Sequence, residues 1–325
     1  MRPDDIDKAV AVLARGGLVA FPTETVYGLG ADASNPAAVK KLYAAKGRPL
    51  DHPVIVHVAD IAQLPQWARE VTPVAHKLAR QFWPGPLTMI FKRAPGVSDG
   101  VTGGQDTVAL RIPSHPVAHL LLEKFGGGVA APSANRFGRV SATLAEHVRQ
   151  EFGAAVDYVV DGGQSDVGIE STVVDATGTA PVLLRPGHIT ARDIELAAGV
   201  GLVMPSAQSP RAPGTLAAHY APATPLLIME SDLLLELAAT LTHQGKRVAV
   251  LARSARQPLL EGITWIAAPA DAQAYAHDLY ANLRALDAAN CAALLVEQLP
   301  QGPEWAAVND RLGRAAAGSR PPSAS

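Results

Sequence analysis

Cysteine is almost absent from this 325-residue chain, which has only Cys291. One thiol cannot form a disulfide within the chain, and it cannot supply the several thiolates that a zinc ribbon or an iron–sulfur cluster requires. A reducing compartment therefore fits best. Because Cys291 begins an apolar stretch, we interpret it as a buried core thiol rather than as a nucleophile.

Long apolar runs and an excess of one charge are also lacking. The most apolar later stretch, residues 225–241, is interrupted by three acidic residues, so we expect no membrane span. The acidic start, MRPDDIDKAV, lacks the apolar core of a signal peptide, and we expect a cytoplasmic protein. Basic and acidic residues number 19 and 20 up to residue 200, then 9 and 10 beyond it. The net charge of neither part would attract nucleic acid or membranes, so any phosphate site must be formed by a few neighbouring residues.

What is present predicts a folded protein of about two domains. Hydrophobic residues make up 48% of the sequence and charged residues 18%, which excludes a disordered chain. Over residues 1–200, helices are predicted to begin near residues 4, 36, 73, 116 and 143, and strands are predicted at 18–21, 53–58, 87–91, 108–112, 128–131, 158–160, 171–175 and 181–185. Without strict alternation, this order favours an α/β domain with a twisted mixed sheet.

The second part of the chain is predicted to be a smaller α/β domain. Residues 201–225 are rich in Pro, Ser, Ala and Gly without an apolar period, which predicts a linker. Over residues 226–318, strands and helices follow in a βαβ-like order, which predicts a small parallel, Rossmann-like sheet. Residues 319–325 are expected to be a disordered tail.

Several common catalytic motifs are missing from the sequence. It contains no GxxxxGK[ST] loop, no HExxH and no GxSxG. The glycines of YGLG, and those at 126–128, lack the rest of a dinucleotide fingerprint.

Cations at strand and helix ends are the first unexplained polar groups. Lys46 and Arg48 flank Gly47, where a helix is predicted to stop. They either favour the carboxyl end of that helix or form a paired phosphate grip. Arg111 lies inside the apolar strand VALRIP, which requires either a carboxylate partner or a ligand.

Small hydroxyl and amide groups gather at similar positions. APSAN, residues 131–135, follows a predicted strand, and Ser141 either caps the next helix or binds an anion. The full set at such ends comprises Thr25, Lys46, Arg48, Arg111, Ser133, Asn135, Ser141, Ser171 and Arg185. It suits a polyanion plus a small zwitterion, with catalysis by positioning and charge neutralisation, as in nucleotidyl transfer.

These motifs together resemble the YrdC-domain family. The similar segments are PTETVYGLGADA, KGRP, VALRIP, APSANRFGRVS, IESTVVD and LRPG. APGTLAAHYAP, residues 212–222, resembles a linker segment of the family's long two-domain form, the threonylcarbamoyl-AMP synthases. The resemblance implies a YrdC-like sheet with a concave basic cleft, and a reaction of L-threonine, bicarbonate or CO2, and ATP. The products would be threonylcarbamoyl-AMP, used for t6A modification of tRNA at position 37, and pyrophosphate.

The resemblance also implies roles for individual residues. Lys46 and Arg48 would hold the ATP phosphates and serve catalysis, with Mg²⁺ carried on the phosphates rather than by the protein. The remaining nucleotide positions would be His52, Thr107, Ser133, Asn135, Ser141, Arg185 and Tyr220. The threonine positions would be Thr25, His57, Arg111, Ala131, Ser171 and Thr172.

Two departures from the family pattern affect these expectations. Asp51 and His52 stand where an Asn is usual, so the nucleotide contact of that Asn passes to His52 or is lost. The linker has Ala212 where Ser is usual. We expect this linker, through His219 and Tyr220, to be able to cover the site and protect the adenylate from water.

The sequence is also compatible with other functions. The chain could be a double-stranded RNA or tRNA-binding module without catalysis, although its balanced charge predicts weak or no direct tRNA binding. A carbamoyltransferase of the hydrogenase-maturation type would need zinc-finger cysteine pairs that the chain lacks. A nucleotide-binding regulator has no specific feature in its favour. For the synthase, the expected downstream partner is the machinery that transfers threonylcarbamoyl to tRNA.

Overall fold

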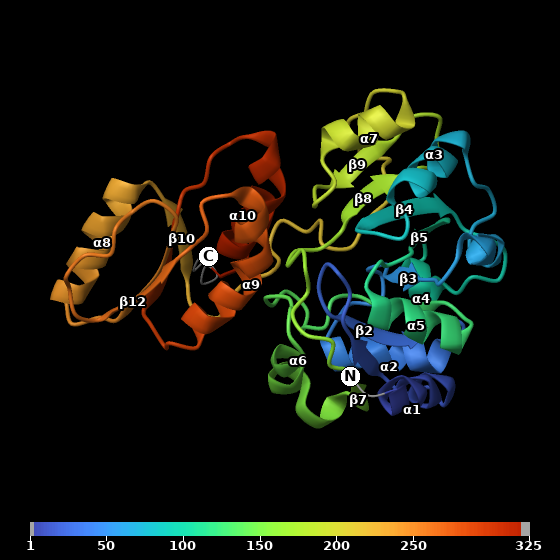
Figure 1. Cartoon of the computed structure of the whole chain (residues 1–325), viewed down its shortest axis with the longest axis horizontal. Coiled ribbons are helices and arrows are strands. Elements are labelled where there is room, and N and C mark those ends of the chain that lie inside the picture. Colours follow the sequence, from blue (N-terminus) through green and yellow to red (C-terminus); the bar gives the residue numbers. More distant parts are fainter. Residues whose placement is uncertain (1–2, 320–325) are drawn as a thin grey trace. The chain divides into compact units, whose positions relative to one another are not determined.

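The computed structural model describes residues 3–319, which divide into two compact units. The first unit contains the chain up to Phe137 and Ala142–Thr215, and the second contains Gly138–Ser141 and the chain from Leu216. Figure 1 shows the elements of both units, which are described one at a time below. The predicted boundaries at residues 200 and 226 stay predictions. Among the described residues, no helix has the length and apolarity needed to cross a membrane.

The first unit is built on a nine-stranded mixed sheet. Its strand order is β7-β1-β2-β6-β3-β5-β4-β8-β9. The strands are β1 (Val19–Phe21), β2 (Gly28–Asp32), β3 (Ile55–His57), β4 (Leu87–Lys92), β5 (Thr107–Arg111), β6 (Val129–Ala130), β7 (Tyr158–Val159), β8 (Thr172–Asp175) and β9 (Val182–Arg185). Because β3 pairs parallel with β5 and antiparallel with β6, the predicted mixed sheet is confirmed.

Among the helices of the first unit, α2 begins and ends at the predicted capping residues, and α3 begins at its predicted cap. The helices are α1 (Pro3–Ala14), α2 (Pro36–Lys46), η1 (Ile61–Gln66), α3 (Pro73–Phe82), α4 (Asp99–Thr102), α5 (Pro116–Phe125), α6 (Ala145–Phe152), η2 (Gly153–Ala155) and α7 (Ala191–Ala198). Asn35 caps α2 through its side chain, and Gly47 ends it in the left-handed conformation. Thr72 caps α3 in the same way as Asn35 caps α2.

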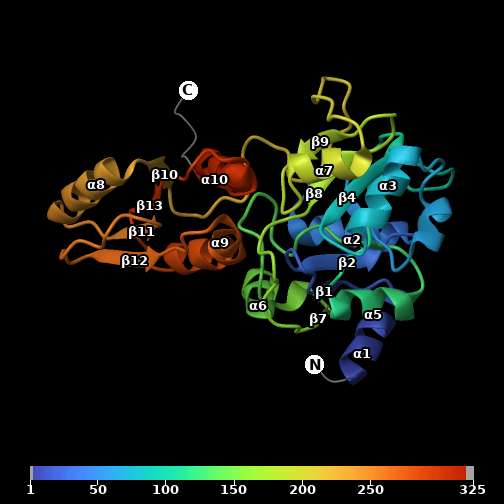
Figure 2. The same cartoon turned by 45° about the horizontal axis from the view of Figure 1, so that its top comes forward.

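The two faces of this sheet are covered differently. The main core, which includes Val56 and Leu110, packs on one face under α2, α3 and α7. On the other face, α1 and α5 cover β1, β2 and β6 through a cluster that includes Phe21 and Val129. Figure 2 shows α1 and α5 on the side of β1 away from α3 and α7. We call the side that carries α1 and α5 the α1/α5 face.

Beyond α1 and α5, the α1/α5 face carries a small apolar cluster. Its buried members are Ile55, Ile90, Ala109, Val173 and Ala212. Side chains alternate along a strand, so His57 shares this face with Ile55, and Arg111 shares it with Ala109. On this half of the sheet, the polar side chains of His57 and Arg111 therefore lie beside the apolar cluster, which we call the apolar floor.

The second unit is a four-stranded parallel sheet, as the sequence predicts. The strand order is β10-β13-β11-β12, with every described pair parallel. Its elements are β10 (Leu226–Met229), α8 (Ser231–His243), β11 (Val248–Ala252), β12 (Ile263–Ala267), α9 (Ala272–Asp287), β13 (Ala293–Glu297), η3 (Pro303–Trp305) and α10 (Ala306–Ser319). Helix α9 packs on β11 and β12, and α8 packs on β13 and β11.

Some local features differ from the sequence expectations. Strand β2 and helices α4 and α7 are not among the predicted elements. The suggestion that Ser141 caps a helix is wrong, because α6 begins at Ala145 after Leu144. Of the expected disordered tail, Ser319 ends α10 and residues 320–325 lie outside the described residues.

Candidate active site

The loop after β1 places two residues of the PTET motif against Arg111. Arg111 Nη1 donates to Thr25 Oγ1 over 2.7 Å, and Arg111 Nη2 lies 2.8 Å from Glu24 Oε1. All three side chains are buried. The sequence left a ligand and a carboxylate open as partners of Arg111, and the structure supplies a carboxylate that we did not predict. The available signal was that Glu24 is the only acid in the motif beside Thr25.

Unsatisfied polar atoms collect at this point. Within residues 3–319, Glu24 Oε2 and His57 Nδ1 have no hydrogen-bond partner, and the contact of Arg111 Nη2 with Glu24 Oε1 is an ion pair that lacks hydrogen-bond geometry. Buried polar atoms are nearly always bonded, since each unsatisfied one costs about 1–3 kcal/mol. A buried ion pair whose two ends both keep bonding capacity matches a small zwitterion.

The charge states of these side chains follow from burial and from Arg111. Burial alone would raise the pKa of Glu24, but the charge of Arg111 at 2.8 Å acts against burial, and the pKa is lowered. Burial, followed by the charge of Arg111, lowers the pKa of His57 to about 3. At neutral pH, the site therefore holds a carboxylate, a guanidinium and a neutral imidazole.

The register of the sheet brings further candidates into one row. His57 is paired with Arg111 across β3 and β5, and the ladder of β5 and β4 continues the row to Thr88. Thr88 is paired with Val173, which is paired with Arg185. At ~4.8 Å per strand, Arg185 lies roughly 14 Å from Arg111 along this row.

Arg185 and Ser171 close the far end of the row. Arg185 donates to the Ser171 carbonyl from Nε and Nη2, and Nη2 lies 3.2 Å from Ser171 Oγ. Ser171 Oγ also lies 2.8 Å from Thr88 Oγ1. Thr172 differs from Ser171, because its hydroxyl donates to the Ile189 carbonyl and accepts from the Ile189 N–H. That bonding gives Thr172 a structural task in holding the chain after β9.

Lys46 and Arg48 bind backbone carbonyls of neighbouring loops rather than the end of their own helix. Lys46 Nζ donates to the Ser133 carbonyl over 2.6 Å and also to the Asn135 carbonyl. Arg48 Nη2 donates to the Pro53 carbonyl over 2.7 Å. Burial, and then Arg48, lower the pKa of Lys46 well below its ordinary value. Because carbonyls do not cancel a positive charge, an anion beside Lys46 would favour its charged form.

The APSAN loop is held close to β2. Ser133 forms an isolated bridge with Gly28, and a Cβ on Gly28 would lie 3.3 Å from the Ala131 side chain. A Cβ on Gly30 would come within 2.8 Å of Phe21, so the YGLG glycines permit close packing of strands. Asn135 is buried beyond this bridge, and its Nδ2 donates to the Arg136 carbonyl.

Thr107 and His52 lie toward the amino end of β3. Thr107 begins β5 on the side of Ala109 and Arg111 by alternation. The His52 ring packs edge-on against Phe137 at 5.3 Å between ring centroids. Burial, and then Arg48, lower the pKa of His52. Neither residue shares a described side-chain bond with Glu24, Thr25 and Arg111, which we call the Arg111 cluster.

Ser141 and Tyr220 belong to the second unit. The Ser141 carbonyl accepts from Arg284 Nε over 3.1 Å. Tyr220 is buried with a left-handed φ of 60°, and its ring packs near His219, Tyr280 and the Arg311 guanidinium. The structure thus does not group these two predicted positions with the others in one unit.

The first half of the predicted linker lies on the first unit. Ala212 joins the apolar cluster of the α1/α5 face, and the Pro213 carbonyl accepts from Arg185 Nη1 over 2.7 Å. Arg211 is bonded to Gln105 and to the Gly103 carbonyl. The segment at 211–213 therefore covers the apolar floor beside Arg185.

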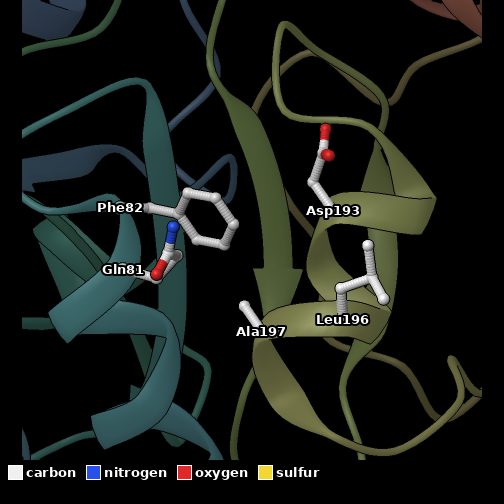
Figure 3. A pocket seen from close by; sticks show the side chains of 5 residues that line it. All are labelled: Gln81, Phe82, Asp193, Leu196 and Ala197. Atoms are coloured by element: carbon white, nitrogen blue, oxygen red, sulfur yellow. The ribbon is translucent and has the colours of Figure 1, made fainter.

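A separate pocket lies between α3 and α7 (Figure 3). Its lining residues are Gln81, Phe82, Asp193, Leu196 and Ala197. Helices α3 and α7 pack against the main core on the opposite face of the sheet from Arg111. The pocket and the candidate residues are therefore distinct places in the first unit.

Protein ligands for a metal ion are not gathered at the site. Within the part of the chain that the structure describes, no three His, Cys, Asp or Glu residues are placed to hold an ion. The one carboxylate of the Arg111 cluster, Glu24, is already paired. These residues do not fit a protein-held ion.

The sheet and the site define a two-unit α/β enzyme with buried cations, and comparisons with known proteins agree. A family model described as telomere recombination matches residues 11–187. A second, described as the C-terminal domain of threonylcarbamoyl-AMP synthase, matches residues 189–317.

Full-length relatives identify the family. Threonylcarbamoyl-AMP synthase of Bacillus subtilis is 41% identical, covering 96% of this chain and 93% of the relative. That of Pyrococcus abyssi is 38% identical, covering 94% and 92%. The crystal structure of P. abyssi Sua5 complexed with L-threonine is similar with a TM-score of 0.89 at 37% identity, covering 97% of this chain and 94% of that one. This chain belongs to the threonylcarbamoyl-AMP synthase family.

Proposed function

We propose that this chain condenses L-threonine, bicarbonate or CO2, and ATP into threonylcarbamoyl-AMP and pyrophosphate. The observation that carries the proposal is the ion pair of Glu24 and Arg111, where both partners keep unsatisfied buried atoms. Threonine is a zwitterion that could satisfy both. The P. abyssi relative was crystallised with L-threonine, which supports this substrate.

Arg111 has the capacity to bind the threonine carboxylate as well as Glu24. A guanidinium has five N–H donors, and the described contacts with Gly85, Thr25 and Glu24 involve three of them. Its remaining N–H groups would donate to the carboxylate. Glu24 would face the amine, and Thr25, His57, Ala131, Ser171 and Thr172 would complete or support the threonine position.

The chemistry then proceeds in two steps. The threonine ammonium group first loses one proton, and the resulting amine then forms a bond to the carbon of CO2 and loses a second proton, giving a carbamate. A carbamate oxygen next forms a bond to the α-phosphorus of ATP, while the bond from that phosphorus to the bridging oxygen breaks and pyrophosphate leaves. Glu24, whose pKa Arg111 lowers, would stay ionised and face the amine position, so both protons would pass to solvent.

Lys46 and Arg48 would neutralise the charge that develops on departing pyrophosphate. Two of the three Lys46 N–H groups donate to loop carbonyls, which leaves the third for a phosphate oxygen. His52, Thr107, Ser133, Asn135, Ser141, Arg185 and Tyr220 remain the proposed nucleotide positions. Mg²⁺ would arrive on the ATP phosphates, where it supplies further charge neutralisation.

The proposal extends to partners and location. The product would pass to the machinery that transfers threonylcarbamoyl to tRNA, in the cytoplasm, with weak or no direct tRNA binding by this chain. The balanced charge of the sequence supports the last point.

Pyrophosphate release from ATP tests the reaction. Release should require both L-threonine and bicarbonate, and mass spectrometry should detect threonylcarbamoyl-adenylate. L-valine, which has a methyl group in place of the hydroxyl, is the matched control substrate. Release that ignores threonine, or that occurs equally with valine, would remove the assigned substrate.

A further inference from the structure

Four residues in the middle of the first unit's sequence are grouped with the second unit. Gly138–Ser141 interrupt the first unit, whose chain resumes at Ala142. They belong to the APSANRFGRVS motif, which also contains Ser133 and Asn135. Gly138, with a φ of 79°, is at the point where the chain enters the second unit.

Arg284, in the last turn of α9, binds backbone carbonyls of residues 138–141. Arg284 Nε donates to the Ser141 carbonyl over 3.1 Å, and Arg284 Nη2 donates to the Val140 carbonyl. A guanidinium is a planar, rigid fork, so two bonds to successive carbonyls fix the direction of the peptide between them. Lysine, with one nitrogen, cannot reproduce that geometry.

Asp287, one helical turn further along α9, binds two segments at once. Its carboxylate lies 3.5 Å from Arg139 Nη2, and it accepts the N–H groups of Ala223 and Thr224 over 2.9 and 2.8 Å. Residues three apart lie on the same side of a helix, so Arg284 and Asp287 act from one side of α9.

The two segments held by α9 are also bonded to each other. The Ala221 N–H donates to the Gly138 carbonyl over 2.7 Å, and Arg139 forms an isolated parallel bridge with Ala221. Residues 138–141, residues 221–224 and the end of α9 therefore form one hydrogen-bonded junction, which we call the α9 junction.

We infer that Arg284 and Asp287 are positioning residues that set the conformation of the nucleotide-contacting loop from the second unit. The inference rests on the proposed function, in which Ser141 contacts ATP. The inference assigns the second unit a role in the reaction. Helix α9 fixes the backbone around Ser141 and also binds residues 223–224 at the end of the linker. Neither Arg284 nor Asp287 needs to touch the substrate.

Hydrogen exchange of the full chain tests the junction without reference to activity. In Arg284→Met, exchange at the Ala221 N–H should rise at least tenfold, because residues 138–141, whose Gly138 carbonyl accepts this N–H, lose both bonds from Arg284. In Asp287→Asn, the same rise should occur at Ala223 and Thr224. The matched controls are Arg247→Met, at an exposed arginine of the second unit, and Asp278→Asn, on α9. Exchange equal to that of the controls would overturn the junction.

Nucleotide binding tests the positioning role. Arg284→Met should weaken ATP binding at least tenfold in calorimetry and raise the KM for ATP, while the KM for threonine stays within twofold and the melting temperature matches Arg247→Met. Arg284→Lys should recover only part of the loss. Unchanged ATP affinity, or an equal loss for threonine, would overturn the inference. If the parent protein binds ATP but releases no pyrophosphate with threonine, the proposed function fails, and the ATP affinities still decide the inference.

Discussion

Buried charge is handled differently in the two units. In the first, the buried cations Lys46, Arg48 and Arg185 donate to carbonyls of Ser133, Pro53 and Ser171. In the second, the buried carboxylate of Glu297 accepts three backbone N–H groups, from residues 253–255, and two serine hydroxyls. Carbonyls stabilise a cation but leave its charge uncancelled, whereas a carboxylate with five donors has its bonding capacity filled.

The difference indicates that buried polar groups have different roles in the two units. The Glu297 arrangement joins the carboxyl ends of β13 and β11 and the start of α8, which is a structural task. The arrangement around Lys46 and Arg111 leaves bonding capacity in a buried place, which suits a ligand. Changes in the first unit should therefore affect the reaction, and changes at Glu297 should affect stability.

The largest effect is expected for Lys46→Met, which removes the buried charge and keeps most of the side-chain volume. Product formation should fall by about 10²–10³-fold, because the charge on pyrophosphate is no longer neutralised. Threonine affinity, measured by calorimetry, should stay unchanged. The control is Lys40→Met, at an exposed lysine of the same helix. A rate equal to that of the control would show that Lys46 only supports the APSAN loop.

Glu24→Gln should have the next largest effect, and it should lower both the reaction rate and the stability of the fold. It leaves the Arg111 guanidinium buried without its carboxylate, so the free energy of unfolding should fall by about 3 kcal/mol. The pKa of Glu24 is lowered in the folded state, so its stabilising contribution is present above about pH 4.5 and is lost as the pH falls further. Urea unfolding at pH 7 and pH 3.5 should show a smaller pH dependence in the variant than in the parent. Equal dependence would mean that Glu24 is not held ionised by Arg111.

Glu297→Gln should reduce stability by about 2 kcal/mol, because an amide NH2 replaces one acceptor among the backbone N–H groups. Burial raises the pKa of Glu297, but hydrogen bonds from Ser254, Ser231 and Ala255 outweigh it and lower the pKa to about 2. Its contribution should therefore persist until the pH falls below about 4.5 and disappear toward pH 2. At pH 7, the folded variant should keep the parent KM for ATP and for threonine. A changed KM would contradict the division between the two units.

The sequence predicted those parts of the fold that short-range chemistry determines. Asn35, Pro36 and Gly47 specify both ends of α2, and the apolar alternation of VALRIP specifies β5. It missed β2, whose glycines lower strand propensity and are required only because Phe21 and Val129 pack against them. Helix α7 was missed although Thr190 and Asp193 form a capping box there.

For the site, the sequence identified single residues better than their partners. A buried arginine in a strand predicted that Arg111 needs a partner, but Glu24 is 87 residues away in the chain and only tertiary structure brings it close. In the same way, nothing periodic in residues 211–213 indicates that Ala212 packs on the sheet or that Arg185 binds the Pro213 carbonyl. The contact of Arg284 with Ser141 spans an even longer separation and carries no local pattern.

The smallest expected effect concerns His57, and it distinguishes a binding residue from an acid–base catalyst. Burial, followed by the charge of Arg111, lowers the pKa of His57 to about 3, so the imidazole should stay neutral from pH 5 to pH 8. The imidazole signals of His57 in NMR should accordingly not titrate over this range, and the activity should show no inflection that His57→Gln removes. The matched variant is His243→Gln, at an exposed histidine at the end of α8, and it should leave the pH profile of the activity unchanged. A His57 that titrates near pH 6.5 would mean that its imidazole is not buried beside Arg111, and the proposed threonine site would lose His57.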